Sequence, residues 1–237
     1  MFGDFKSDAN DVFESLVEVC RHDPLFPEDR KGDPSHDDGW GYVAMDQNSI
    51  DFRRYREPIF NSRKPEFPES GILVVHARKA AAGEPVGMLD SHPHHRSNTE
   101  YDVYLVHNGS YRKENIAGAL NEGNLDNQPD SEFFLEYLMR QEGDIEEKIR
   151  KTLEDSGRFD FVKTTNNIFV LAVDKVTRKG RLFYYGDSRF DNEYVTMYRV
   201  EKEGWVGVVS SSLLKASRFP HDVKIEKVEQ RELVEIT

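Results

Sequence analysis

Two polar clusters in the sequence combine residue types suited to binding a small charged molecule. In the first, Asp38, Gly39 and Trp40 precede an apolar segment. They predict either a tight turn with close backbone approach to a ligand or a turn anchored by the tryptophan. In the second, His76 and Arg78 end an apolar run that starts at residue 72. The planar guanidinium fork matches a carboxylate, so Arg78 is either a carboxylate-binding residue or a surface residue at a strand end.

Two further clusters carry donors and acceptors for an amide and an amino group. Asn108 and Gly109 follow another apolar run. A side-chain amide beside a glycine N–H can supply the two donors of an oxyanion hole. The same Asn-Gly pair is also a strong signal for a β-hairpin turn. Asp130 opens a helical pattern, where its carboxylate is suited to cap the helix and to accept hydrogen bonds from a substrate ammonium group.

A fifth cluster, formed by His92, His94 and His95, has the composition of a metal site. Zinc ligands commonly occur as two separated pairs, and no cysteine accompanies these histidines. We therefore interpret them as loop histidines. The single cysteine, Cys20, lies on the apolar stripe of the first predicted helix, where a thiol is buried and inert. We expect no metal, no cofactor and no catalytic role for Cys20.

These clusters require secondary structure to position them. Apolar stripes predict helices over residues 8–21, 113–120, 131–141 and 144–154. Runs of β-branched and aromatic residues predict strands over residues 41–45, 72–76, 101–107, 167–174, 181–185, 194–200 and 205–210. Polar stretches predict loops over residues 23–39 and 122–129. The strands outnumber the helices and occur in runs, which favours an α+β architecture in one domain spanning residues 1–237.

The composition argues against several classes of protein. The chain has 237 residues, with 15 Phe, 10 Tyr and 2 Trp, which is enough for a folded core. It has 32 Lys and Arg against 44 Asp and Glu, a net charge of −12, which argues against a nucleic-acid partner or a polybasic membrane anchor. No apolar run reaches the ~20 residues of a membrane span, and no signal peptide opens the chain. We expect a cytoplasmic protein with neither a membrane nor a nucleic-acid partner.

The order of the clusters is more specific than any one of them. The sequence contains, in order, His36-x-Asp38-Gly39-Trp40-Gly41, His76-x-Arg78, Ser91-His92-Pro93, His107-Asn108-Gly109 and Asp130-Ser131-Glu132. This series resembles the class II glutamine amidotransferases, and most closely their small stand-alone branch. The resemblance runs from the first predicted strand to about residue 140 and continues more weakly through 167–174 and 208–211.

The resemblance implies an N-terminal-nucleophile hydrolase fold, a four-layer αββα arrangement with two stacked, mainly antiparallel sheets between helical layers. It implies hydrolysis of the side-chain amide of glutamine, or of a γ-glutamyl amide, to glutamate and ammonia. By the family pattern, Arg78 binds the α-carboxylate and Asp130 the α-ammonium group. The Asn108 side chain and the Gly109 N–H stabilise the oxyanion. The remaining residues assigned to the substrate pocket are His76, Asp38, Gly39 and Trp40.

The sequence departs from this family at the nucleophile. The family nucleophile is a cysteine that becomes N-terminal when the initiator methionine is removed, and its own α-amine serves as the base. This chain begins Met1-Phe2-Gly3, with no cysteine nearby. Members of the branch often begin Met-Cys-Arg, an apolar residue and then Phe-Gly or similar. One interpretation is therefore that translation starts three residues upstream; the other is that the nucleophile has been lost and the binding pocket kept.

Three functional hypotheses remain open. The first is a glutaminase or γ-glutamyl amide hydrolase with a small-molecule substrate, able to pass ammonia to a separate synthase. The second is a catalytically inactive homologue that binds glutamine or a γ-glutamyl compound and regulates a partner. The third is a metal-dependent hydrolase built on His92, His94 and His95. The true N-terminus discriminates between the first two, and the metal content of the purified protein tests the third.

Overall fold

The computed structural model describes residues 1–6, 8–28, 32–81, 83–123, 128–190 and 192–237. In these ranges the chain forms two antiparallel sheets and the helices α1 (Asp8–Arg21), α2 (Lys113–Leu120), α3 (Asp130–Met139) and α4 (Ile145–Arg158). Sheet A has the order β11 (Lys224–Lys227), β9 (Met197–Lys202), β10 (Trp205–Ser210), β1 (Phe2–Asp4), β4 (Ser70–Ala77), β2 (Trp40–Met45) and β3 (Ile50–Tyr55). Sheet B has the order β12 (Leu233–Ile236), β8 (Gly180–Tyr185), β7 (Val162–Asp174), β6 (Tyr101–Tyr111) and β5 (His94–Ser97). Short 3₁₀ turns occur at Ile59–Asn61, Glu193–Val195 and Ser211–Lys215.

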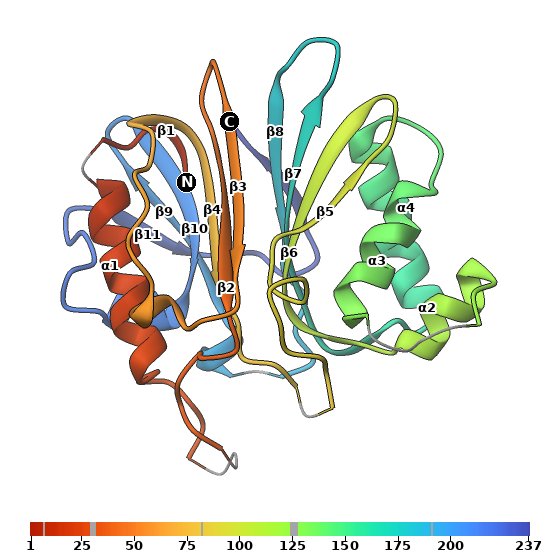
Figure 1. Cartoon of the computed structure of the whole chain (residues 1–237), viewed down its shortest axis with the longest axis horizontal. Helices are drawn as coiled ribbons and strands as arrows, with labels where there is room; N and C mark the ends of the chain where they lie inside the picture. The colour runs from red at the N-terminus through yellow and green to blue at the C-terminus, as the bar shows by residue number, and fades with distance from the viewer. Residues whose placement is uncertain (7, 29–31, 82, 124–127, 191) are drawn as a thin grey trace.

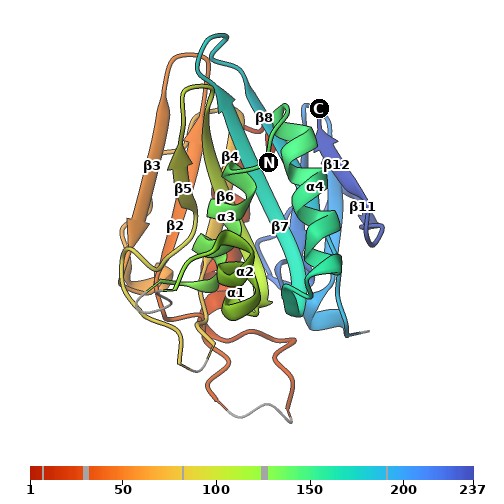
Figure 2. The same cartoon turned by 90° about the vertical axis from the view of Figure 1, so that its right-hand side faces the viewer.

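The two sheets face each other, with helices on both outer sides (Figure 1). Helix α1 covers the outer face of sheet A, and α2, α3 and α4 cover the outer face of sheet B, where they lie in front in Figure 2. Three apolar clusters fill the spaces between these layers, centred on Trp40 under α1, on Val106 between the sheets and on Phe134 under α3. Full burial of one such large side chain contributes about 1.5–3 kcal/mol. The predicted α+β architecture is confirmed.

All four predicted helices are present, but α3 covers Asp130–Met139 instead of 131–141 and α4 covers Ile145–Arg158 instead of 144–154. Helices α1 and α2 have the predicted bounds. Helix α4 starts after Asp144, whose side chain and that of Glu147 form a reciprocal capping box. The prediction that Asp130 caps α3 is wrong: the N-cap is Pro129, and Asp130 is the first helical residue. Its carboxylate is therefore directed elsewhere.

The seven predicted strands correspond to β2, β4, β6, β7, β8, β9 and β10, and the missed strands include all four sheet edges. Strand β9 begins at Met197 instead of residue 194, because Asn192 accepts a hydrogen bond from the Tyr194 N–H and starts a 3₁₀ turn. The predicted loop at 23–39 has no helix or strand in its described part. Residues 124–127 of the loop predicted at 122–129 lie outside the described residues.

Candidate functional site

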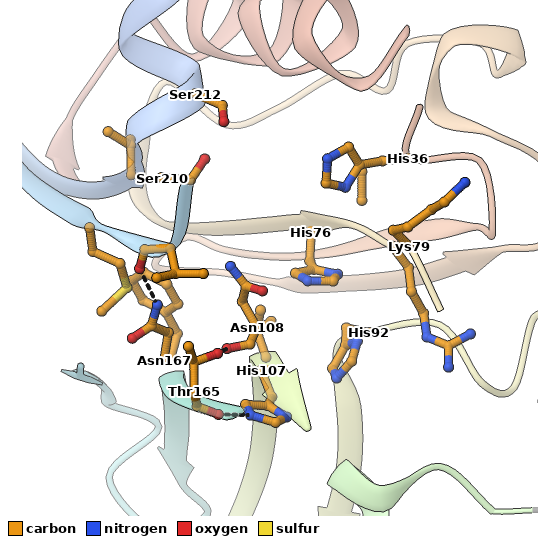
Figure 3. A pocket seen from close by; sticks show the side chains of 18 of the residues that line it. His36, His76, Lys79, His92, His107, Asn108, Thr165, Asn167, Ser210 and Ser212 are labelled. Carbon is orange, nitrogen blue, oxygen red and sulfur yellow. Dashed lines mark hydrogen bonds between the residues drawn. The ribbon is translucent and has the colours of Figure 1, made fainter. Parts of the chain in front are cut away.

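A cavity of about 760 Å³ opens between the two sheets, and five of the predicted site residues line it. Its walls come from the ends of β4, β6, β7 and β10, the start of α3 and the inner side of α1. Figure 3 shows several of these side chains around one open space. The predicted residues that meet here are His76, Arg78, Asn108, Gly109 and Asp130.

Arg78 follows β4 directly and places a cation in this cavity. Its side chain is only 5% exposed, and its Nη1 donates to the Pro85 carbonyl at 2.9 Å. Among the described residues, no carboxylate lies within ion-pair distance of it. Burial lowers the pKa of Arg78, while the charges of Asp90 and Asp38 oppose that shift. A buried guanidinium with free donors is suited to bind a carboxylate of a ligand.

Asp130 lies at the start of α3 and is also buried. Its Oδ2 accepts from the backbone N–H of Tyr111 at 2.6 Å, and its Oδ1 is 3.1 Å from the Ser131 hydroxyl. The neighbouring His107 links the same hydroxyl, at 2.9 Å, to the Thr165 carbonyl. These contacts orient Asp130, and a carboxylate has acceptor sites left for a ligand ammonium group.

Asn108 and Gly109 lie inside β6, opposite Asn167 and Asn166 of β7. The alternative that they form a hairpin turn is therefore wrong. Asn108 follows Val106 by two residues, so its side chain is on the face of β6 that looks toward sheet A. Strand β5 pairs with β6 only up to Leu105, so this part of β6 has a partner strand on one side alone. The register shifts after Gly109, and such irregularities are common beside active sites.

The turn at residues 38–40 does not line the cavity. Trp40 is fully buried under α1, stacks on Tyr55 with ring centroids 4.5 Å apart, and donates through Nε1 to Ser62. Asp38 accepts from the Ala80 N–H at 2.8 Å, and the backbones of Asp38 and Gly39 bond to that of Arg78. The turn therefore holds the backbone that carries Arg78.

The histidines separate into two environments. His92 and His94 are buried and form a row with His76, with ring centroids 4.6 Å and 4.4 Å apart. His95 points to the other face of β5, where it binds Asp102 and stacks on Tyr104. His94 and His95 lie in β5, so the interpretation of these two as loop histidines is wrong, and the alternation of side chains along the strand keeps them apart. Within the described ranges, no group of three or more His, Cys, Asp or Glu side chains is arranged to hold a metal ion.

Strand β1 brings Met1 to the wall of the cavity in the middle of sheet A. Its ammonium group donates to the Leu73 carbonyl at 2.7 Å, and burial lowers the pKa of this group to about 5. Strands β4 and β10 both continue past Met1, through 74–77 and 208–210. In the described chain, no strand lies between residues 74–77 of β4 and residues 208–210 of β10. Residues of both segments line the cavity. The cavity therefore includes a slot one strand wide, flanked by backbone groups that need hydrogen-bond partners.

The structure adds a polar group that the sequence did not indicate. Asp23, in the loop after α1, is 4% exposed and binds His36 Nε2 at 3.0 Å and the Ser212 hydroxyl at 2.7 Å. All three residues line the cavity. His36 belongs to the motif His36-x-Asp38-Gly39-Trp40-Gly41. Asp23, however, is 13 residues from His36, and Ser212 is 189 residues from Asp23. No local pattern could have joined them.

Cys20 also borders the cavity, through α1. Its side chain is 1% exposed, and burial followed by the charge of Asp23 raises the pKa of the thiol. A protonated, enclosed thiol is a poor nucleophile. The structure is consistent with Cys20 as a packing residue.

No profile of a known protein family matches the chain, and no curated protein matches its sequence. None of the helices in the described ranges has the length and apolar character that a membrane span requires. The functional argument therefore depends on the geometry of the cavity.

Proposed function

We propose that the cavity binds an α-amino acid and that the protein is a glutaminase-like hydrolase of the side-chain amide of glutamine or of a γ-glutamyl amide. The observation that carries the proposal is one cavity that holds a buried Arg78, with no carboxylate partner among the described residues, and a buried Asp130. An α-amino acid carries a carboxylate and an ammonium group on one carbon, so it complements this pair. Electrostatic complementarity of this kind favours a zwitterion over a simple acid or amine.

The layered arrangement supports an N-terminal-nucleophile hydrolase fold. Two antiparallel sheets lie between α1 and the helices α2–α4 (Figure 1). The start of β1 borders the cavity, and its ammonium group has a lowered pKa. A neutral α-amine near this place is a suitable base for a nucleophile on the same residue.

The register of β1 predicts where an added nucleophile would lie. Phe2 is opposite Ile72 of β4 and Val206 of β10. The residue two positions before Met1 would therefore be opposite Val75 and Val209, inside the slot. A cysteine there would border the cavity from the face of sheet A that Val75 and Val209 share with α1, whereas Asn108 lines the same cavity from sheet B. The reaction would then proceed through a thioester, with the Asn108 amide and the Gly109 N–H stabilising the oxyanion.

The alternative function is a binding module without catalysis. It is favoured by the enclosed thiol of Cys20, the single cysteine of the sequence. In this case Arg78 and Asp130 bind the same amino acid, and no bond is broken.

Calorimetric titration of the chain with glutamine tests the shared part of both functions. We expect saturable binding of glutamine, and binding at least ~10-fold weaker for 4-aminobutanamide and for glutaramic acid. The first analogue lacks the α-carboxylate and the second lacks the α-amine, so each leaves one buried charge without its partner. Equal binding of all three compounds, or of none, would contradict the proposed pocket.

A further inference from the structure

The hydrogen bonds of Asp23 determine the proton positions on His36. Asp23 Oδ1 accepts from the Leu25 N–H at 2.9 Å and from the Ser212 hydroxyl at 2.7 Å, and Oδ2 faces His36 Nε2 at 3.0 Å. Burial alone would raise the pKa of Asp23, but these hydrogen bonds lower it. An ionised carboxylate only accepts hydrogen bonds, so Nε2 of His36 carries a proton. Nδ1 is then the nitrogen that exchanges protons.

The arrangement differs from a Ser-His-Asp nucleophile triad. In such a triad the serine hydroxyl gives its proton to the histidine. Here the Ser212 hydroxyl donates to the carboxylate of Asp23 instead, on the opposite side from His36. Ser212 therefore supports Asp23 and is not activated as a nucleophile.

His36 lies across the cavity from the predicted oxyanion donor. In Figure 3 the rings of His36 and His76 and the side chains of Ser210 and Asn108 surround the same space. Among the described residues, Nδ1 of His36 has no hydrogen-bond partner, and the side chain is 21% exposed. His36 is also close enough to His76, at the end of β4, to contribute to the lowered pKa of that residue. His36 therefore has a proton-exchanging atom on the side of the cavity opposite Asn108.

We propose that His36, held by the positioning residue Asp23, is the general acid that protonates the departing nitrogen of the substrate. This proposal rests on the proposed hydrolase function. The thiol adds to the amide carbon and gives its proton to the α-amine. As the oxyanion collapses, the C–N bond breaks and the Nδ1 proton of His36 moves to the leaving nitrogen, which gives the thioester and ammonia. Water then attacks the thioester, returns a proton to Nδ1, and the α-ammonium group reprotonates the departing thiolate.

The test compares two leaving groups in a chain extended by Met-Cys-Arg before Met1. Glutamine must lose ammonia, whereas γ-glutamyl-4-nitroanilide loses a stabilised anilide that needs less protonation. We expect His36→Gln to lower kcat/KM for glutamine ~100–10,000-fold, the usual range for a general acid, and kcat/KM for the nitroanilide less than ~10-fold. The ratio kcat/KM reports on the steps up to formation of the thioester. It is therefore independent of the rate at which water later hydrolyses the thioester.

The matched control is His95→Gln, which breaks a second His–Asp pair of 3.1 Å that lies outside the cavity. His95→Gln should leave kcat/KM unchanged for both glutamine and the nitroanilide. Asp23→Asn should shift His36 toward the other tautomer, which the ¹⁵N spectrum of the imidazole ring reports. It should also lower kcat/KM for glutamine more than kcat/KM for the nitroanilide. Glutamine binding to each variant verifies that the pocket is folded.

Equal losses on both substrates, or no loss, would overturn the assignment of His36 while leaving the hydrolase function intact. An extended parent chain that is inactive on both substrates would instead overturn the proposed hydrolase function, and this assignment with it.

Discussion

At the scale of single residues, Arg78 places a buried cation in the wall of the cavity. Its guanidinium is buried, and in the described part of the chain no carboxylate pairs with it directly. Desolvating a cation costs several kcal/mol, and a ligand carboxylate would offset that cost. Substitution of Arg78 therefore tests the binding part of the account.

Arg78→Ala should weaken glutamine binding by about 2–4 kcal/mol, or ~30–1000-fold, because it removes a charge-assisted contact and leaves the ligand carboxylate unpaired. Titration calorimetry measures the effect. Arg54→Ala is the matched control: Arg54 donates to the Leu89 carbonyl but does not line the cavity, so its loss should leave binding unchanged. Unaltered binding in Arg78→Ala would rule out the proposed role.

Asn108→Ala should lower kcat ~100–1000-fold in a chain that carries the added cysteine, with little change in KM. The amide would stabilise charge that develops in the transition state and is absent from the bound substrate. Steady-state kinetics separate the two parameters. A raised KM at constant kcat would make Asn108 a substrate-binding residue and not an oxyanion donor.

How far the sequence predicts the site depends on how local each signal is. Arg78, Asn108 and Asp130 stand in short motifs beside apolar runs, so their chemistry is readable before the fold is known. The hairpin alternative for Asn108 failed because β7 pairs with β6 through this position. The pairing of Asp23 with Ser212 joins residues far apart in sequence, and only tertiary structure reveals it.

At the scale of elements, the predictions succeeded where apolar residues recur. The central strands β4, β6 and β10 have apolar runs, and α1 has a continuous stripe. Four of the missed strands, β3, β5, β11 and β12, lie at the sheet edges, where one side has no partner, and the fifth, β1, is a three-residue strand inside sheet A. Edge strands commonly carry charged residues, and β11 reads Lys-Ile-Glu-Lys with all four residues exposed. Such segments lack the alternation that predicts a half-buried strand.

Strand register provides an element-scale prediction. An extension of Met-Cys places the cysteine directly before Met1. The extension Met-Cys-Arg places it one residue further from Met1. Side chains alternate across a strand, so a shift of one residue moves the thiol to the other face of sheet A. The shorter extension places the thiol opposite Val74 and Val208, on the face between the sheets, and the longer one opposite Val75 and Val209, on the face toward α1, so we expect their glutaminase activities to differ at least ~100-fold. Intact mass must show methionine removal in both, and equal activities would contradict the β1 register.

At the scale of the whole molecule, the interior contains a row of buried histidines, His76, His92 and His94, that runs from the end of β4 to β5 beside α3. Burial lowers the pKa of His76 to about 3 and lowers the pKa values of His92 and His94, against about 6.5 in an unfolded chain. Below pH 6.5 the unfolded chain therefore binds protons that the folded chain does not. Stability should fall as the pH falls from 6.5 toward 3.

Urea unfolding at pH 7.5, 6.5 and 5.5 measures this dependence. The free energy of unfolding should decrease below pH 6.5, by up to about 1.4 kcal/mol per pH unit for each such histidine. His92→Leu should reduce the slope, because both ring nitrogens of His92 lack hydrogen-bond partners among the described residues and an apolar side chain suits the site. A flat profile, or equal slopes for both proteins, would contradict neutral buried histidines.

The shape of the whole molecule was predictable only in outline. Composition and strand count predict α+β layers, but the cavity and the strand-wide slot beside Met1 depend on how β1, β4 and β10 pair across the chain. Register over such sequence distances has no local signal. The slot is the feature that connects the fold to the proposed chemistry.

Glutamate release from glutamine tests the central claim most directly, measured in parallel on the 237-residue chain and on the same chain extended by Met-Cys-Arg before Met1. Intact mass must show that the added methionine is removed, and the same extension with serine in place of cysteine serves as the matched control. We predict glutamate and ammonia in equal amounts from the cysteine-bearing chain, and at least ~100-fold less from the other two. Release of no glutamate from any of them would contradict the hydrolase function, and equal release from the unextended chain would contradict the proposed position of the nucleophile.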